Sequence, residues 1–186
     1  AKHAELRPFY QIHDSRYMMY WLALTDASYK SYVDSLANIE KQRIILEKRS
    51  LDHVATGEQQ PETDHAMYEK SSITGNTQNI FYRDANNGGF FSYDMTTNSE
   101  TDLKLYLRYW GVAEWGIRIF DIYIDDVKMT TVDNTHRWNQ SQFKTEEYNI
   151  PDVLVKGKKH IRVKFQAHQD ASIGGIYDVR ILKTQP

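Results

Sequence analysis

Residues Asp102–Val127 read DLKLYLRYWGVAEWGIRIFDIYIDDV. Two runs in this stretch, Leu103–Tyr109 and Phe120–Ile124, alternate apolar with polar side chains, and the segment between them holds two tryptophans and two glycines. A period of two sends successive side chains to opposite faces, so each run predicts a half-buried antiparallel strand. We therefore expect a pair of strands with Trp110 and Trp115 at its tip, either as packing at the rim or as a platform for a flat ligand.

The strand pattern continues through the chain after residue 51. Asn86-Asn87-Gly88-Gly89 has the Asn-Gly signature of a tight turn and predicts a hairpin between Ile80–Ala85 and Phe90–Met95. Turn residues recur at short intervals, with no helical pattern between them. This spacing predicts a mainly β protein, an antiparallel β-sandwich of jelly-roll type with about eight strands. The other strands are expected at residues 127–132, 143–150, 159–167 and 176–182.

Residues 25–50 have a different character. Apolar residues recur there at helical spacing among charged ones, and Thr25 or Asp26 can cap the first turn. The pattern predicts one amphipathic helix of about six turns, and a packing helix that links two domains is favoured over a recognition helix. We expect residues 1–24 to be the tail of an upstream β-sandwich domain, residues 25–50 a linker helix, and residues 51–186 a carboxyl-terminal β-sandwich domain.

Composition excludes several classes of function. Lysine and arginine number 23 against 25 aspartates and glutamates, so no dense basic surface is available for nucleic acid, which we do not expect as a partner. No apolar run approaches the roughly 20 residues that span a bilayer, and no membrane partner is expected. The chain contains no cysteine, which excludes disulfides, thiolate metal sites and cysteine nucleophiles.

Aromatic and polar residues near the predicted turns are candidates for carbohydrate binding. Sugars are commonly held by an aromatic face with hydrogen-bond donors beside it, and His136-Arg137-Trp138 offers both in one probable loop. A tryptophan that only closes the edge of the sandwich is an equally good interpretation of Trp138. The candidate binding residues are Trp110, Trp115, Trp138, Arg118 and His136.

Two motifs carry a resemblance to a known family. Pro8–Trp21 reads PFYQIHDSRYMMYW and Gly57–His65 reads GEQQPETDH; Arg83-Asp84-Ala85, Gly89–Asp94 and Tyr109-Trp110-Gly111 follow in the same order. Together they resemble the carboxyl-terminal part of glycoside hydrolase family 127, the β-L-arabinofuranosidase-like group. The resemblance implies that an upstream (α/α)6 barrel carries catalysis and that this chain is a non-catalytic accessory domain supporting the barrel.

The same resemblance bears on activity, partners and location. Family members use a cysteine nucleophile beside a zinc ion held by cysteines and a glutamate, and this chain has no cysteine at any such position, so no catalytic residue is expected here. The implied partner is the catalytic domain of the same polypeptide, and the implied location is periplasmic or secreted. If residues 16–24 are separated from an upstream sheet, their unpaired strand edge and exposed apolar side chains predict self-association or folding back onto this domain.

The closing strands also resemble carbohydrate-binding jelly rolls of the galactose-binding-like type. This likeness makes a carbohydrate-binding module for plant or other polysaccharide the alternative to a purely structural role. In such modules an acid on the last strand helps to hold a structural calcium ion, which would place Asp178 beside Glu58 or Glu62. No other cofactor is expected, and a solvated loop is the favoured interpretation of the acids near residue 60.

Overall fold

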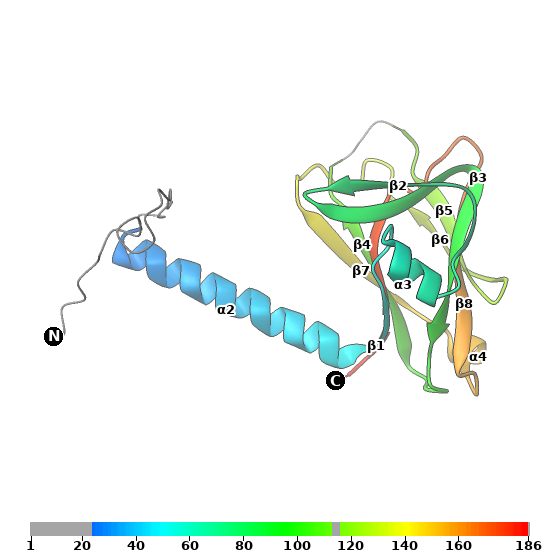
Figure 1. Cartoon of the computed structure of the whole chain (residues 1–186), viewed down its shortest axis with the longest axis horizontal. Coiled ribbons are helices and arrows are strands. Elements are labelled where there is room, and N and C mark those ends of the chain that lie inside the picture. Colours follow the sequence, from blue (N-terminus) through cyan, green and yellow to red (C-terminus); the bar gives the residue numbers. More distant parts are fainter. Residues whose placement is uncertain (1–23, 113–115, 186) are drawn as a thin grey trace, which may run out of the picture. The chain divides into compact units, whose positions relative to one another are not determined.

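The structure, a computed structural model, describes residues 24–112 and 116–185 (Figure 1). The chain divides into two compact units, the first ending at Gln42 and the second beginning at Arg43. Helix α2 spans Asp26–Arg49, and the Thr25 hydroxyl accepts a hydrogen bond of 3.2 Å from the backbone N–H of Ser28, which caps its first turn. The expected helix before the sheet is therefore confirmed. No helix in the described ranges has the length and apolar content needed to cross a bilayer.

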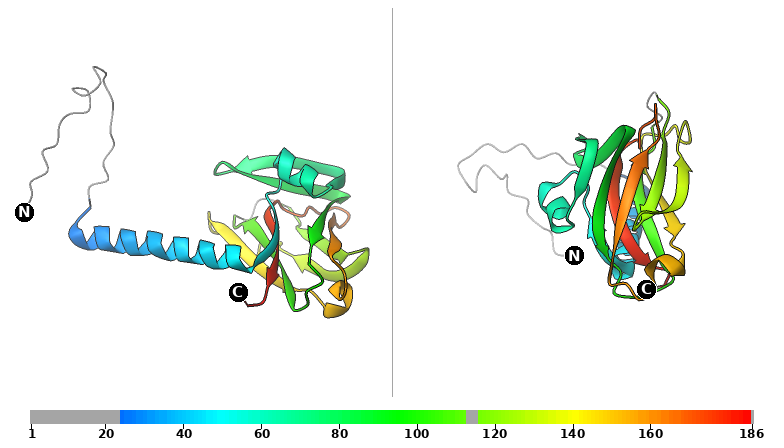
Figure 2. Two further views of the ribbon diagram at one scale, coloured as in Figure 1. Left: turned by 60° about the horizontal axis from the view of Figure 1, so that its bottom comes forward. Right: turned by 90° about the vertical axis from the view of Figure 1, so that its right-hand side faces the viewer.

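The second unit is built on a curled antiparallel sheet, to which the described residues contribute nine strands. The order is β6-β5-β8-β3-β9-β4-β7, with β1 paired to β9 and β2 paired to β3. The sheet curls until its strands face one another in two layers, as Figure 2 shows. The strands are β1 Ser50–Val54, β2 Tyr68–Thr77, β3 Ile80–Thr96, β4 Leu103–Trp110, β5 Ile119–Ile124, β6 Val127–Asp133, β7 Phe143–Asn149, β8 His160–Ala167 and β9 Ile176–Lys183, and two short helices, α3 Gln59–Asp64 and α4 Asp152–Val155, lie between strands.

The core lies between the two layers and confirms the alternating pattern. On β4 the side chains of Leu103, Leu105 and Leu107 face the core and are buried, whereas Lys104 and Arg108 on the other face are half-buried; Tyr106 on that face is buried as well. Burial of large aliphatic and aromatic side chains contributes about 25 cal/mol per Å2 of apolar surface, so this layer of contacts is the main source of stability. The mainly β, sandwich-type fold expected from the sequence is therefore confirmed. Other fully buried core residues are Phe91, Tyr93, Met95, Phe120, Ile122, Ile124, Val163, Phe165, Val179 and Ile181.

The two strands in Asp102–Val127 do not pair with each other, so the expectation that they form one pair is wrong. Strand β4 pairs with β7 and β9, whereas β5 pairs with β6 and β8. The segment between them therefore carries the chain from one part of the curled sheet to another. Each strand gains a partner on both sides in this way, which satisfies more backbone N–H and C=O groups than a hairpin would.

The predicted hairpin at Asn86-Asn87-Gly88-Gly89 is also wrong. Asn87 and Gly88 adopt φ of +50° and +76°, but they form an irregularity inside the single 17-residue strand β3, and the chain does not reverse. Backbone bonds from Asn87 N–H to Ala171 O (2.9 Å) and from Gly88 N–H to His168 O (3.2 Å) hold this irregularity. The hairpin actually lies at Gln78-Asn79, whose φ values of +54° and +61° suit a type I′ turn between β2 and β3.

Candidate functional site

A small pocket lies where several strands begin or end. Trp110 is the last residue of β4, Arg118 directly precedes β5, and Gly174-Gly175 directly precede β9. The ends of β4 and β9 are neighbours because Tyr109 pairs with Ile176. Tyr82 and Asp84 of β3 and Tyr177 of β9 complete the lining, and we name this cavity the loop-end pocket. Its volume is about 30 Å3, which admits one or two small polar groups and leaves the body of a ligand outside.

Aromatic rings form a continuous row beside the loop-end pocket. The ring centroids of Trp110 and Phe143 lie 4.9 Å apart at 70°, and those of Phe143 and Tyr177 lie 5.1 Å apart at 75°. Tyr82 continues the row, 5.1 Å from Tyr177, and the guanidinium of Arg108 lies 3.8 Å from the centre of the Phe143 ring. Edge-to-face contacts of this kind fix ring orientation. The half-exposed Trp110 and Tyr82 therefore present pre-oriented aromatic surfaces at the pocket.

Asp84 supplies the acceptor in the loop-end pocket. Its Oδ1 accepts hydrogen bonds from the backbone N–H groups of Ala85 (2.7 Å), Ile173 (3.1 Å) and Gly174 (3.0 Å). Burial raises the pKa of Asp84, and these backbone bonds offset only part of that rise. Backbone N–H groups thus favour the charged form of Asp84, which lines the pocket as a hydrogen-bond acceptor.

The glycine pair before β9 is required by the shape of the pocket. Gly174 and Gly175 adopt φ of +86° and +74°, a region that side chains disfavour. A Cβ at Gly174 would lie 2.6 Å from Cδ of Arg118, and one at Gly175 would lie 3.2 Å from the ring of Tyr82. These two positions thus allow the Arg118 side chain and the Tyr82 ring to approach the loop backbone closely.

Arg118 is held from both its backbone and its side chain. Its backbone N–H donates to Thr135 Oγ1 at 3.0 Å, and its carbonyl accepts from Asn134 N–H at 2.9 Å. The guanidinium donates from Nη1 to the carbonyl of Val112 at 3.3 Å, and the residue is only 8% exposed. A positively charged donor thus stands in the same cavity as the Asp84 carboxylate.

The structure brings two of the five candidate binding residues together, Trp110 and Arg118. Trp138 instead packs on the core, with its ring centroid 5.6 Å from that of Tyr109 and the Arg137 guanidinium 4.7 Å from its ring centre. His136 lies exposed between β6 and β7 with φ of +52°. Trp115 lies outside the described residues.

Three residues of the loop-end pocket, Tyr82, Asp84 and Tyr177, were not candidates from the sequence. Arg83-Asp84-Ala85 is one of the motifs that resemble glycoside hydrolase family 127, but nothing in the sequence assigns Asp84 to this pocket. The Gly174-Gly175 pair before an alternating run was an available signal for a close backbone approach.

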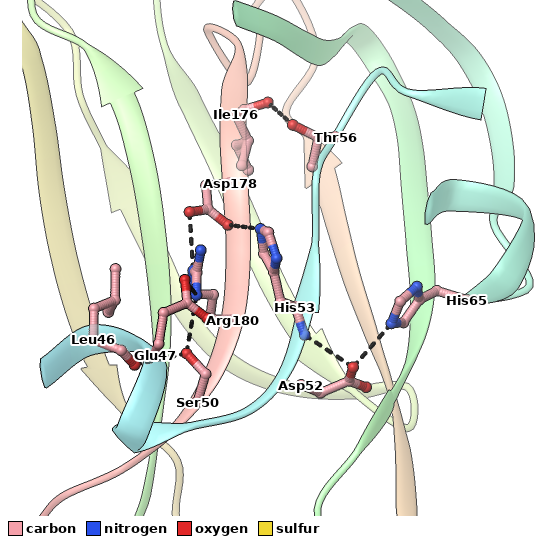
Figure 3. A network of polar contacts seen from close by, with 10 residues as sticks. All are labelled: Leu46, Glu47, Ser50, Asp52, His53, Thr56, His65, Ile176, Asp178 and Arg180. Atoms are coloured by element: carbon pink, nitrogen blue, oxygen red, sulfur yellow. Dashed lines mark hydrogen bonds and ion pairs between the residues drawn. The ribbon is translucent and has the colours of Figure 1, made fainter. Parts of the chain in front are cut away.

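The three acidic residues that are candidates for calcium binding make different contacts. Glu62 is 4% exposed and both its carboxylate oxygens accept from Arg83, while Glu58 is exposed. Asp178 lies 2.9 Å from Nε2 of His53 and 3.0 Å from Nε of Arg180, as Figure 3 shows. Within residues 24–112 and 116–185 no group of three or more acidic or histidine side chains is arranged to hold a metal ion. A calcium ion on Glu62 would have to displace Arg83, and calcium binding stays a prediction.

The network around Asp178 has a clear structural role. Arg180 also donates to Glu47 (2.9 Å) and to the Ser50 hydroxyl (3.1 Å), which joins the last turn of α2 and β1 to β9 (Figure 3). Across β1, His65 lies 3.0 Å from Asp52, and this contact ties α3 to β1. Arg180 thus accounts for one oxygen of Asp178, whereas Oδ1 lies close to His53 Nε2 but accepts no hydrogen bond from the described residues.

Comparison with known proteins gives one family and several similar folds. The model of a family of unknown function (DUF6805) matches residues 45–182. A search of curated proteins finds no match. A family 35 carbohydrate binding module from an environmental isolate is similar in structure, with a TM-score of 0.53 and 17% identity over 65% of this chain and 89% of that module.

Two further structures share the fold. The family 35 module of Abf62 from Cellvibrio japonicus has a TM-score of 0.50 and 12% identity over 70% of this chain and 92% of its own. An exo-β-1,3-galactanase from Phanerochaete chrysosporium, solved with β-1,3-galactotriose, has a TM-score of 0.52 and 9% identity over 72% of this chain and 29% of the enzyme. At these identities the likeness establishes a shared fold, and function must be argued from the site.

Proposed function

This chain belongs to the DUF6805 family, and we propose that it is a carbohydrate-binding module whose ligand docks at the loop-end pocket. The observation that carries the proposal is the meeting of the half-exposed Trp110 and Tyr82 with Asp84 and Arg118 in one cavity. Aromatic faces stack on the apolar side of sugar rings. A carboxylate and a guanidinium beside them form hydrogen bonds that distinguish sugars by the positions of their hydroxyl groups. The fold shared with family 35 modules supports this choice over a purely structural role.

The size of the pocket sets the mode of binding that we propose. A cavity of about 30 Å3 holds a hydroxyl or hydroxymethyl group and excludes a whole ring. The sugar ring would then lie outside, against Trp110, with one edge directed at Asp84 and Arg118. This mode favours a chain end or an exposed side group of a polysaccharide as the ligand.

The test is isothermal titration of the chain with arabino-, xylo- and β-1,3-galacto-oligosaccharides. We expect at least one of these sugars to bind, and Trp110→Ala to weaken that binding about tenfold or more, because stacking and pre-orientation are lost together. The matched control is Tyr68→Ala, which removes an aromatic side chain that is 63% exposed on β2. Equal affinity in wild type and Trp110→Ala, or no binding to any of the sugars, would contradict the proposal.

We also propose a second role, in which helix α2 packs on the catalytic domain of a glycoside hydrolase of family 127. Tyr29, Leu36 and Ile39 lie on the helix with 61%, 48% and 62% of their surfaces exposed. Apolar side chains at this spacing suit packing on another domain, and a catalytic barrel of that family is the partner that we propose.

This role is tested by sedimentation with a separately produced family 127 catalytic domain. We expect a complex that Leu36→Asp/Ile39→Asp abolishes and that Lys41→Asp, on the same helix, preserves. Absence of any complex with the wild-type chain would overturn the supporting role. We also propose that the chain alone has no glycosidase activity; hydrolysis of an aryl arabinofuranoside by the purified chain would contradict this.

A further inference from the structure

A larger cleft lies on the other side of β3 from the loop-end pocket. Helix α3 lies beside the β2–β3 hairpin (Figures 1 and 2), and the cleft that they line has a volume of about 410 Å3. This volume falls within the range of about 300–1,000 Å3 that is usual for small-molecule sites. We name it the hairpin cleft; the lining residues that matter below are Gln59, Glu62, Thr63, Met67, Thr74 and Arg83.

The hairpin cleft contains a buried ion pair. The Glu62 and Arg83 side chains are 5% and 10% exposed, and Arg83 donates from Nε and Nη2 to the two carboxylate oxygens at 2.6 and 2.5 Å. The Tyr93 hydroxyl (2.7 Å) and the Gly57 N–H (2.8 Å) donate to the same carboxylate. Burial alone would raise the pKa of Glu62, but these bonds and the charge of Arg83 lower it on balance. The pair is therefore self-neutralised and rigid.

Hydrogen-bonding capacity remains in this cleft after the pair is made. A guanidinium has five N–H donors, and the bonds between described residues use three of those on Arg83: two to Glu62 and one to the Ser72 hydroxyl at 2.6 Å. The amide of Gln59 and the hydroxyl of Thr74 are on exposed residues that line the cleft. Hydrogen-bond donors and acceptors thus line the cleft, while the charges of Glu62 and Arg83 neutralise each other.

Apolar surface accompanies these polar groups. Met67 lines the cleft with a half-buried, adaptable side chain. Phe81 lies two residues before Arg83 on β3, hence on the same face of the strand, and is 46% exposed. Its Cβ lies 3.1 Å from where a Cβ on Gly57, a lining residue, would be. Phe81 therefore lies next to a residue that lines the cleft.

We propose that the hairpin cleft is a second ligand site, separate from the loop-end pocket, and that it takes an uncharged polyhydroxylated ring such as one sugar residue. A charged ligand is disfavoured because an anion would draw Arg83 from Glu62 and leave a buried carboxylate unpaired, which is costly. A neutral ring can accept from the remaining Arg83 donors and rest on Met67 or Phe81 without disturbing the pair. The loop-end pocket is independent, because Tyr82 and Asp84 point to the opposite face of β3 from Arg83.

The test is a series of amide NMR titrations of the full chain with D-galactose, L-arabinose, D-xylose and D-galacturonate. We expect at least one neutral sugar to shift the amide signals of Gly57, Gln59, Thr63 and Thr74, with galacturonate at least threefold weaker. In Thr74→Trp these shifts are expected to be lost, because Thr74 pairs with Arg83 across the hairpin and an indole there covers the cleft. The variant should fold, since Thr74 is exposed and tryptophan suits a strand.

Two controls separate the sites. Val127→Trp adds the same side chain at an exposed position of β6 and should leave the shifts unchanged. Trp110→Ala should preserve them as well, because the loop-end pocket takes no part, so this result holds whether or not that pocket binds glycan. Absence of shifts at these amides with every neutral sugar, unaltered shifts in Thr74→Trp, or stronger binding of galacturonate than of each neutral sugar would overturn the proposal.

Discussion

The loop-end pocket and the hairpin cleft share one wall, strand β3, and are built in opposite ways. The pocket is small, and its side chains are held by aromatic contacts and by loop backbone in a conformation that favours glycine. The cleft is larger, and it depends on a buried ion pair between Glu62 and Arg83. Consecutive residues of β3 serve the two cavities, because Arg83 faces one and Tyr82 and Asp84 face the other. A single strand can thus separate a site that depends on close packing from one that depends on a buried ion pair.

The largest expected loss of stability comes from breaking the ion pair of the hairpin cleft. Glu62→Gln removes the charge that neutralises Arg83 and should lower the free energy of unfolding by about 3–5 kcal/mol, because a buried guanidinium is left without its partner. Urea denaturation measures this loss. The control Glu58→Gln, at the exposed N-cap of α3, should change stability by about 0.5 kcal/mol or less, because this side chain makes no capping hydrogen bond. A loss below about 1 kcal/mol in Glu62→Gln would show that the pair does not organise the cleft.

The fold was largely predictable from local pattern. The core-facing residues of β4 and β5 follow from a period of two, which needs no knowledge of partners, whereas the burial of Tyr106 and Asp121 on the other face does not. Strand β2 was not predicted, because its residues are mostly polar and exposed and show no such period. The Asn87-Gly88 sequence is typical of a tight turn and also of a bulge. Here the chain continues through it as one strand because β2 and β8 pair with β3.

The candidate site was predictable only in part. Residue type and loop position single out Trp110 and Arg118, and the structure places both in the lining of the loop-end pocket; their part in binding stays a prediction. Trp138 has the same residue type but packs on Tyr109, and that difference depends on which strands adjoin in space. Asp84 was beyond prediction, because its place depends on backbone N–H groups that a distant loop, Ile173-Gly174, delivers.

A smaller loss of stability is expected from a substitution in the glycine pair of the loop-end pocket. Gly174→Ala should cost about 2–3 kcal/mol, since it combines an unfavourable φ of +86° with a Cβ only 2.6 Å from Arg118 Cδ. Gly157→Ala is the matched control: φ is +76° and no atom lies within 4 Å of the added Cβ, so only about 1 kcal/mol is expected. Thermal and urea unfolding of both variants measures the difference. Equal losses in the two would show that close packing on Arg118 contributes nothing.

The smallest effect concerns the attachment of α3, which carries one wall of the cleft. The hydrogen bond to Asp52 raises the pKa of His65 in spite of burial, which lowers it. Burial raises the pKa of Asp52, but bonds from His65, Thr96 and His53 lower it on balance. The His65 contribution is complete below about pH 6.5 and is lost as pH rises through its raised pKa; the Asp52 contribution is present above about pH 3.9 and is lost as pH falls through its lowered pKa.

We therefore expect His65→Gln to lower stability by about 1 kcal/mol near pH 5.5 and by less near pH 8.5. Urea denaturation at the two pH values measures the change, with the exposed His136→Gln as control. A larger destabilisation at pH 8.5 than at pH 5.5 would contradict the role assigned to the protonated imidazole.

Carbohydrate binding at the loop-end pocket can be followed through the indole N–H signal of Trp110 during NMR titration with oligosaccharides. We expect a binding oligosaccharide to shift this signal together with the amide signals of Gly174 and Gly175, while the indole signal of the core-packed Trp138 stays unchanged. Binding that leaves Trp110, Gly174 and Gly175 unshifted, or no binding by any oligosaccharide of the arabino-, xylo- and galacto- series, would contradict it.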